Sequence, residues 1–279
     1  MKLTDLSTVK ALCAQYGFNF KKKFGQNFIV SASVPEDIAA VARGGCALEI
    51  GPGIGTLTAE LCNVCEKVVA VEIDTALAPL LETTVGENKN LKVFFDDIMK
   101  TDIKSLCDTE FAGKKIYVCA NLPYYITTPV LIHLMESGVD FECITVMVQK
   151  EVADRLCAKA GTSEYGAITL TCQMHGRVVK RFDVPRHCFY PVPGVDSSVI
   201  SIIPAEKEKI DCKDKKMLER VIRATFNQRR KTLANALSAE LKHLSKEQIT
   251  DIIVNCGHRA DIRGEKLTLA QFAQIVNNM

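Results

Sequence analysis

A glycine-rich loop constrains the fold of this chain more than any other stretch. The apolar residues Ala47 to Ile50 have the length of a strand, and Gly51, Gly53 and Gly55 follow at alternate positions before a helical pattern begins. Glycines in such a loop allow a ligand to lie against the backbone and the next helix to start tightly. The dinucleotide-binding fingerprint needs a further glycine at a position that holds Thr56 in this chain. The loop therefore favours a ligand without the pyrophosphate of a dinucleotide.

Acidic residues follow the next two predicted strands. The second strand, Val68 to Val71, is followed by Glu72 and Asp74, and an acid at this place can accept hydrogen bonds from both hydroxyls of a ribose. Because Glu72 lies closer to the strand end, we favour it over Asp74. The third strand, Leu91 to Phe95, is followed by Asp97, whose carboxylate can accept a hydrogen bond from an adenine amino group. Each acid alone would be taken for a solvated loop charge, but the three strand ends together predict S-adenosylmethionine as the cofactor.

A short motif after a fourth strand carries the predicted chemistry. Residues 116–120 form that strand, and Asn121-Leu122-Pro123-Tyr124 follows it. The carboxamide oxygen of Asn121 can accept a hydrogen bond from the exocyclic amino group of a base, as can the backbone carbonyl of Leu122. Pro123 stiffens the turn, and Tyr124 offers a flat face on which a base can lie. The alternative is a buried strand followed by an ordinary proline turn, and the glycine loop upstream favours the first interpretation.

Two further segments are predicted to border the same pocket. Residues 23–29 precede the core, and we expect them to form a lid in which Asn27 and Ile29 touch the cofactor. The proline-rich residues 184–197 predict a rigid, extended loop. From this loop Phe189 is expected to stack on the base opposite the tyrosine of the motif. The alternatives are a turn packed over the sheet for the first segment and a core position for Phe189.

The pattern of secondary structure changes along the chain and predicts two domains. Apolar strands alternate with helical stretches from about residue 45 to residue 204, which argues for a parallel, doubly wound sheet. From about residue 211 the periodicity is helical. We therefore predict a first domain of residues 1–207, with a basic N-terminal segment, and a helical domain of residues 208–279, joined at the charged stretch 206–209. The later strands are expected at 143–148, 178–182 and 197–203, and the helices at 3–16, 214–226, 229–242, 246–255 and 268–277.

The net charge of +2 conceals an uneven distribution of charged residues. Residues 1–30 carry five Lys and Arg against one acid, residues 31–150 carry nine against seventeen, and residues 207–246 carry twelve against five. The densest clusters are 21–23 and 229–231. Basic ends around an acidic middle suggest that the ends bind a polyanion such as RNA, although each cluster alone is equally a solvated surface.

Other sequence features exclude whole classes of protein. The chain contains no apolar run near the roughly 20 residues of a membrane span, and its first residues lack the apolar core of a signal peptide. The twelve cysteines are scattered and lie mostly in apolar segments, so we expect free buried thiols. Cys62 and Cys65 have the spacing of a zinc knuckle, but no second pair follows to complete four ligands. These observations predict a cytoplasmic protein without a metal.

Taken together, these motifs resemble those of the ribosomal RNA adenine N6,N6-dimethyltransferase family, in particular its bacterial small-subunit (16S) branch. The resemblance runs nearly end to end. It rests on the segments 24–28, 49–55, 71–74, 96–97, 121–125, 189–197 and 226–233. It implies an α/β fold with a Rossmann-like class I methyltransferase sheet and a small C-terminal all-α domain that recognises RNA. Gly194 stands where relatives can carry larger or basic residues.

The resemblance also implies an activity and a set of contacts. The activity is dimethylation at N6 of two adjacent adenosines in the 3′-terminal hairpin of 16S rRNA, within the immature 30S subunit, by a protein that we expect to be a monomer. The implied S-adenosylmethionine contacts are Asn27, Ile29, Gly51, Glu72, Asp97 and Asn121, to which the loop adds Gly53.

Three other functions remain open from the sequence. The nearest is a 23S rRNA adenine methyltransferase that confers macrolide resistance, because it shares the core motifs. A nicotinamide-dependent dehydrogenase is disfavoured by Thr56 and by the Asn-Leu-Pro-Tyr motif. A non-catalytic assembly factor is disfavoured because that motif is intact.

Overall fold

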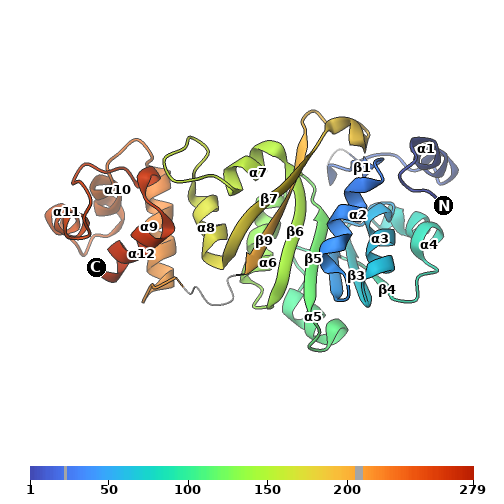
Figure 1. Ribbon diagram of the computed structural model, residues 1–279, viewed down its shortest axis with the longest axis horizontal. Helices are drawn as coiled ribbons and strands as arrows, with labels where there is room; N and C mark the ends of the chain where they lie inside the picture. The colour runs from blue at the N-terminus through green and yellow to red at the C-terminus, as the bar shows by residue number, and fades with distance from the viewer. Residues whose placement is uncertain (22–23, 205–209) are drawn as a thin grey trace. The chain divides into compact units, whose positions relative to one another are not determined.

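The computed structural model describes residues 1–21, 24–204 and 210–279, and its elements are labelled in Figure 1. The chain divides into two compact units. The first contains residues 1–153 and 179–204, and the second contains residues 154–178 and the described residues from 210 onward. Within the described residues, no helix is long and apolar enough to cross a membrane.

A seven-stranded sheet organises the first unit. Its order is β4-β3-β2-β5-β6-β9-β7; the four pairs from β4 to β6 are parallel, and β9 runs antiparallel to β6. The order reverses at β2, so the loops after β2 and β5 leave the sheet at the switch point where open α/β sheets bind ligands. The strands are β2 (Cys46–Ile50), β3 (Lys67–Glu72), β4 (Leu91–Phe95), β5 (Ile116–Asn121), β6 (Phe141–Gln149), β7 (Gly176–Val184) and β9 (Ser197–Pro204).

Apolar residues fix the centre of this sheet. All five residues of β2 are buried, as parallel strands covered on both faces require. A separate two-stranded sheet joins β1 (Phe28–Ile29) to β8 (Phe189–Tyr190) in antiparallel register. The helices of this unit are α1 (Leu6–Gln15), α2 (Ser33–Ala39), α3 (Thr56–Val64), α4 (Ala78–Val85), α5 (Ile103–Phe111) and α6 (Thr127–Glu136), with the 3-10 turns η2 (Ala40–Ala42), η3 (Thr75–Leu77) and η4 (Arg186–Cys188). Helix α7 (Lys150–Leu156) follows β6 and runs into the second unit.

The second unit is helical and has its own core. Tyr165, Leu218 and Phe272 are almost fully buried in it, and the Tyr165 hydroxyl donates to the carbonyl of Leu267 at 2.9 Å. This buried bond ties residues before β7 to the C-terminal helices. The helices are α8 (Ala167–His175), α9 (Lys215–Asn227), α10 (Leu233–Glu240), α11 (Lys246–Asn255) and α12 (Leu269–Asn277), with η5 (Gly264–Lys266) before the last.

The structure confirms the predicted fold class and refines the predicted elements. All expected strands and C-terminal helices are present within a few residues of their predicted bounds. The sheet is not parallel throughout, because β9 returns beside β6 in the opposite direction. Residues 154–178 belong to the helical unit, whereas the sequence placed them in the first domain. The predicted boundary at 207/208, the stretch 206–209 and the lysines Lys22 and Lys23 lie outside the described residues.

All twelve cysteines are free thiols. Burial raises the pKa of Cys62 and that of Cys65 to about 12 each, so both thiols stay protonated at neutral pH. In the part of the chain that the structure describes, no group of three or more His, Cys, Asp or Glu side chains could hold a metal ion.

Candidate active site

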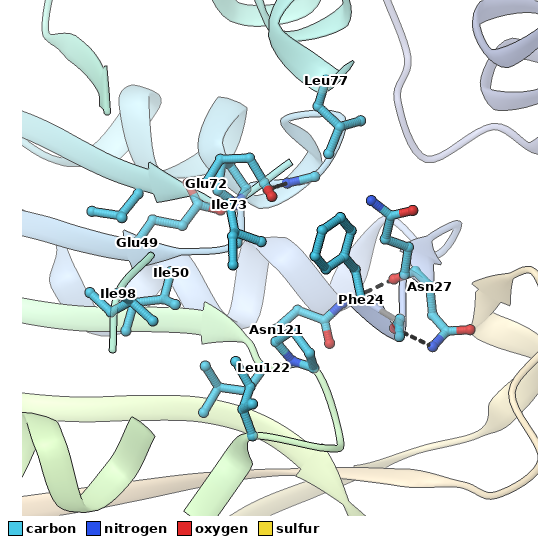
Figure 2. Close-up of a pocket in the computed structure, with 18 of the residues that line it drawn as sticks. Phe24, Asn27, Glu49, Ile50, Glu72, Ile73, Leu77, Ile98, Asn121 and Leu122 are labelled. Atoms are coloured by element: carbon cyan, nitrogen blue, oxygen red, sulfur yellow. Dashed lines mark hydrogen bonds between the residues drawn. The ribbon is translucent and has the colours of Figure 1, made fainter. Parts of the chain in front are cut away.

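A pocket of about 330 Å³ opens at the carboxyl ends of the parallel strands. Its walls are the loops that follow β2, β3, β4 and β5, together with the segment around β1 (Figure 2). Because the carboxyl ends of parallel strands meet at one edge of a sheet, four loops distant in sequence share one cavity. The lining includes nearly all the residues predicted to bind cofactor or base: Asn27, Ile29, Gly51, Gly53, Glu72, Asp97, Asn121, Leu122, Pro123 and Tyr124.

The glycine loop after β2 needs its glycines for conformational reasons. Gly51, Gly53 and Gly55 have φ values of +69°, +60° and +87°, in the left-handed region that other residues rarely adopt. A Cβ atom at Gly55 would also lie 2.9 Å from Cγ1 of Val85. The loop therefore presents bare backbone to the pocket, and α3 starts directly after it.

The two acids after β3 have separate surroundings. Glu72 is 5% exposed and lines the pocket, and its carboxylate accepts from the backbone N–H of Gly53 at 3.2 Å and of Asp74 at 2.9 Å. Burial raises the pKa of Glu72, and these two hydrogen bonds oppose the rise. Asp74 is 2% exposed and is absent from the lining, because its carboxylate points toward other partners. Of the two acids, Glu72 is the one that a ligand in the pocket would meet.

The carboxylate of Asp97 lies in the lining after β4. Its Oδ1 accepts from the backbone N–H of Met99 at 3.0 Å, and Lys100 is 3.9 Å from its other oxygen. This turn holds the carboxylate of Asp97 and leaves it lone pairs for a further donor.

The amide of Asn121 is oriented by a backbone carbonyl from the N-terminal segment. Its Nδ2 donates to the carbonyl of Asn27 at 3.1 Å, as Figure 2 shows. No described group donates to its Oδ1, so the oxygen is available as an acceptor. The turn after it is fixed as well, because Leu122 donates from its N–H to the carbonyl of Met147 at 3.1 Å, and the Thr127 hydroxyl donates to the carbonyl of Pro123 at 3.2 Å.

Tyr124 is anchored through its hydroxyl. The hydroxyl shares a 2.8 Å hydrogen bond with Oγ of Ser197, which is fully buried at the start of β9. Burial raises the pKa of Tyr124, so the phenol is neutral at physiological pH. A half-buried ring held at both ends presents a defined flat face at the pocket.

The predicted second ring does not line the pocket. Phe189 is 2% exposed and belongs to the apolar cluster that contains Ile29, Met147 and Val199. Its strand β8 pairs with β1, with Phe189 opposite Ile29, and this pairing places the ring in the core. The structure therefore brings together every predicted site residue except Phe189.

Sequence reasoning assigned no role to Glu49, which the structure places in the pocket wall. Glu49 is 1% exposed, and within the described residues its Oε2 has no hydrogen-bond partner. Burial raises its pKa from 4.5 to about 8, and the neighbouring carboxylate of Glu72 contributes to the rise. The hydroxyl of Thr56, also in the lining, is likewise unpartnered within those residues. A buried acid among the apolar residues of a strand was a sequence sign of this position.

Over nearly its whole length, the chain is similar to known proteins of one family. A family model described as ribosomal RNA adenine dimethylase matches residues 17–279. The ribosomal RNA small subunit methyltransferase A of Lachnoclostridium phytofermentans is 46% identical over 269 residues, which are 94% of this chain and 92% of that protein. The protein of the same name from Clostridioides difficile is 39% identical over 279 residues, covering 99% of this chain and 96% of its own length.

Solved structures show the same fold. A dimethyladenosine transferase from Plasmodium falciparum has a TM-score of 0.75 at 25% identity, over 88% of this chain and 95% of that chain. The 23S rRNA methyltransferase ErmE has a TM-score of 0.69 at 21% identity, over 90% of this chain and 98% of that chain. At the lower identity the likeness concerns the fold alone.

Proposed function

Because this chain belongs to the ribosomal RNA adenine dimethylase family, we propose that it methylates adenines of 16S rRNA. The proposed reaction adds two methyl groups to N6 of each of two adjacent adenosines in the 3′-terminal hairpin, with S-adenosylmethionine as donor. The observation that carries this proposal is the amide of Asn121. Its nitrogen donates to the carbonyl of Asn27, and its oxygen accepts from none of the described residues in a pocket whose lining includes Gly51 and Gly53.

The donor set of the pocket fits S-adenosylmethionine. The unpartnered Oε2 of Glu49 is a buried acceptor that would suit the cationic amine of the methionine part. Glu72, held by two backbone N–H groups, would accept from the ribose hydroxyls, and Asp97 would accept from the adenine amino group. Gly51 and Gly53 leave room for the cofactor to lie against the backbone, and Asn27 and Ile29 would close the pocket from the N-terminal side.

The substrate adenine needs to leave its stack before its amino group can react. A paired or stacked base cannot present N6 to the pocket, so the nucleotide is extruded or already unpaired. Tyr124 would support the base on its face, and its anchored hydroxyl would keep the ring from turning. The oxygen of Asn121 and the carbonyl of Leu122 would accept hydrogen bonds from N6.

These acceptors explain how the amino group becomes nucleophilic. The N6 lone pair is delocalised into the purine ring, and two acceptors favour a more tetrahedral nitrogen on which the lone pair is localised. The bound cofactor supplies an electrophilic methyl group on a sulfonium. The face of Tyr124 would stabilise, by about 0.5–2 kcal/mol, the positive charge that N6 acquires when it accepts the methyl group. The proton then leaves N6 to solvent, so the site needs no strong base.

Phe189 remains our predicted second ring, although it is buried in the free protein. The substitution Phe189→Leu keeps an apolar side chain in the cluster and removes the aromatic face. If the ring moves to meet the base, kcat should fall about tenfold while the melting temperature changes by only a few degrees. Unchanged transfer would assign Phe189 to the core alone.

The RNA is proposed to bind partly through the helical unit. Arg230 and Lys231 are exposed, whereas Arg229 donates through one nitrogen to the carbonyls of Ser163 and Tyr165 at 3.0 Å each. Arg229 therefore supports the loop before α8, and its two neighbours are free to approach phosphates. We further propose that the protein acts as a monomer on immature 30S subunits in the cytoplasm, where these subunits mature.

A transfer assay on both ribosomal RNAs tests the proposal. Purified protein and tritiated S-adenosylmethionine would be incubated with undermethylated 30S subunits and, separately, with 50S subunits, followed by mass spectrometry of the labelled nucleosides. We expect two adjacent N6,N6-dimethyladenosines in 16S rRNA and none in the Asn121→Ala control. Label in 23S rRNA would instead support the macrolide-resistance activity, and no label in either RNA would contradict the proposed function.

A further inference from the structure

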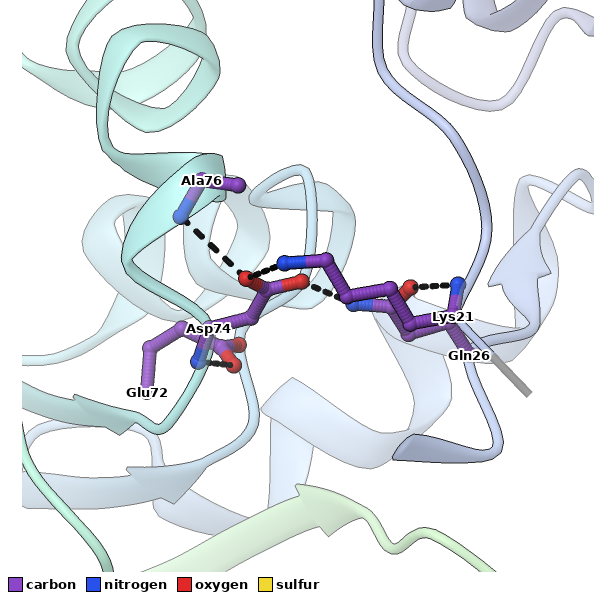
Figure 3. A network of polar contacts seen from close by, with 5 residues as sticks. All are labelled: Lys21, Gln26, Glu72, Asp74 and Ala76. Atoms are coloured by element: carbon purple, nitrogen blue, oxygen red, sulfur yellow. Dashed lines mark hydrogen bonds and ion pairs between the residues drawn. The ribbon is translucent and has the colours of Figure 1, made fainter. Parts of the chain in front are cut away.

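Asp74 is the centre of a partly buried network of polar contacts beside the pocket (Figure 3). Its Oδ1 accepts from the ammonium of Lys21 at 2.6 Å and from the backbone N–H of Ala76 at 3.2 Å, and its Oδ2 accepts from the amide of Gln26 at 2.8 Å. The carboxylate is 2% exposed, whereas Lys21 is 40% exposed. A carboxylate with three donors and little solvent is firmly held, and these donors keep its pKa below the ordinary value despite burial.

The two side-chain partners of Asp74 also bind each other. The backbone N–H of Lys21 donates to Oε1 of Gln26 at 2.9 Å. The three residues therefore form a closed ring, in which the amide of Gln26 donates to Asp74 and accepts from Lys21. Both partners come from the chain before β1, 53 and 48 residues from Asp74. We term Lys21 together with residues 24–29 the strap.

The strap carries the carbonyl that orients the reacting amide. Asn27 follows Gln26 directly, and its carbonyl accepts from Nδ2 of Asn121 at 3.1 Å. The side chain of Asn27 folds back to donate to the carbonyl of Gly25 at 2.9 Å. The far end of the strap, Phe28 and Ile29, is held by pairing of β1 with β8. Asp74 holds the near end, and Asn27 lies between the two fixed points.

The orientation of the Asn121 amide decides whether it accepts a hydrogen bond from the substrate or donates one. Its oxygen and nitrogen have nearly the same shape, and a half-turn exchanges an acceptor for a donor. An N–H group facing N6 of the substrate would repel a donor instead of accepting from it. The bond from Asn121 to the Asn27 carbonyl favours the productive orientation only while the strap stays in place.

We propose that Asp74 is a positioning residue for methyl transfer: by binding Lys21 and Gln26 it fixes the strap, and the strap sets the orientation of Asn121. This inference rests on the proposed function, because it assumes that Asn121 accepts from the substrate amine. Asp74 itself is not among the residues that line the pocket. Its backbone N–H also donates to Glu72, so the acid assigned to the ribose lies beside the same network.

The first test replaces the carboxylate with an amide of the same shape. Asp74→Asn loses the ion pair with Lys21, and one of the two side-chain oxygens of residue 74, both of which accept hydrogen bonds, becomes an amide nitrogen that only donates. We expect faster hydrogen–deuterium exchange of the amides at 24–29 and a kcat about 10- to 100-fold lower, with KM for RNA nearly unchanged. The matched control is Glu110→Gln. Glu110 also binds two lysines, Lys67 at 2.8 Å and Lys92, but is not among the residues that line the pocket. The variant Glu110→Gln should therefore change neither the exchange at 24–29 nor kcat.

The second test restores complementarity with a second substitution. In the double variant Asp74→Asn with Gln26→Glu, the new amide at 74 can donate to the new carboxylate at 26, which still accepts from the N–H of Lys21. We expect the double variant to recover slow exchange in the strap and most of kcat. Recovery in the double variant would tie the loss of kcat to the contact between positions 26 and 74. If Asp74→Asn fails to fold, Gln26→Met breaks the ring from the other side and should raise the same exchange rates.

The outcomes separate this inference from the proposed function. Unchanged exchange at 24–29 in Asp74→Asn, or in Gln26→Met if the first variant does not fold, would overturn the role of Asp74, as would a loss of kcat that the double variant does not recover. A wild-type protein that methylates no rRNA would contradict the proposed function instead. In that case the exchange measurements, made without RNA, would still show whether Asp74 holds the strap.

Discussion

The contacts that orient two side chains of the pocket differ from those that cap the helices of the helical unit. The two pocket contacts join partners far apart in sequence: Asn121 and Asn27 are separated by 94 residues, and Tyr124 and Ser197 by 73. In the helical unit, side chains that begin helices bind backbone N–H groups three residues ahead. Ser245 accepts in this way from Gln248 and constrains nothing beyond its own helix.

Because of this difference, losing one kind of contact should affect the stability of the protein and losing the other should affect the rate of the reaction. Losing a local cap frays one helix and costs about 1 kcal/mol, but it leaves distant groups where they were. Losing a contact between distant segments leaves each element folded and displaces the group that the contact positioned, and small displacements cost large factors in rate. Substitutions that break the two long-range contacts of the pocket should therefore reduce catalysis with little effect on stability, and substitutions at the helix caps should do the reverse.

The largest effect is expected from Asn121→Ala. Removing the acceptor for N6 should lower kcat about 1000-fold, since preorganised hydrogen-bonding groups are worth this much in transition states. Binding of S-adenosylmethionine, measured by calorimetry, should weaken only about threefold. The matched control is Asn277→Ala in the helical unit, where an amide also joins distant backbone groups, Asp211 and Lys213. This control should lower the melting temperature and keep kcat; equal losses of kcat in both variants would undermine the comparison.

Tyr124 should give the next largest effect. Tyr124→Ala removes the stacking face and should lower kcat/KM about 100-fold. Tyr124→Phe keeps the face and loses only the bond to Ser197, so we expect about a threefold loss, and the same loss for Ser197→Ala. Because both changes break one hydrogen bond, the double variant should be no worse than either single variant. Additive losses would show that Ser197 acts on something other than the Tyr124 hydroxyl.

Glu49 should give a moderate, pH-dependent effect on stability. Its pKa is about 8 in the folded protein against an ordinary value of 4.5 for an exposed glutamate, as in the unfolded chain, so the folded state holds an extra proton between these values. Its contribution to the free energy of unfolding is therefore full below about pH 4.5 and is lost as the pH rises through 8. We would measure the free energy of unfolding in urea for the cofactor-free protein from pH 5 to pH 9. Between these values the free energy should fall less in Glu49→Gln than in the wild type, by about 1 kcal/mol or more. Parallel curves for the two proteins would mean that Glu49 is ionised throughout.

The smallest effect is expected at a helix cap. Ser245→Ala removes the bond to the N–H of Gln248 and should lower the free energy of unfolding by about 1 kcal/mol. Ser245→Asp keeps an acceptor at the cap and should restore most of the loss. Both variants should transfer methyl groups within about twofold of the wild type. A tenfold loss of kcat in either would show that the helical unit affects the chemistry through this helix.

The sequence predicted best those features that depend on neighbouring residues. The strands, the glycine loop after the first of them and the place of Glu72 at the end of the second all follow from local pattern. The helices after residue 211 follow from periodicity in the same way. These are the features that a chain specifies within one or two turns of itself.

The features that the sequence did not predict depend on distant pairing. Phe189 has the composition of a stacking residue, but the pairing of β8 with β1 buries it. Residues 154–178 carry no mark of the helical unit, which they join through buried contacts such as that of Tyr165 with Leu267. The ring of Asp74, Lys21 and Gln26 likewise brings together segments about 50 residues apart, and no local pattern predicts such a contact.

The central claim is that Asn121, oriented by the strap, accepts a hydrogen bond from the amino group of an extruded adenine. A crystal structure of the protein with S-adenosylhomocysteine and an RNA hairpin containing two adjacent adenines would test it most directly. We predict one adenine on the face of Tyr124, with N6 about 2.7–3.2 Å from Oδ1 of Asn121 and Nδ2 still bound to the carbonyl of Asn27. An adenine bound elsewhere, or an Asn121 amide whose oxygen faces the strap, would contradict the claim.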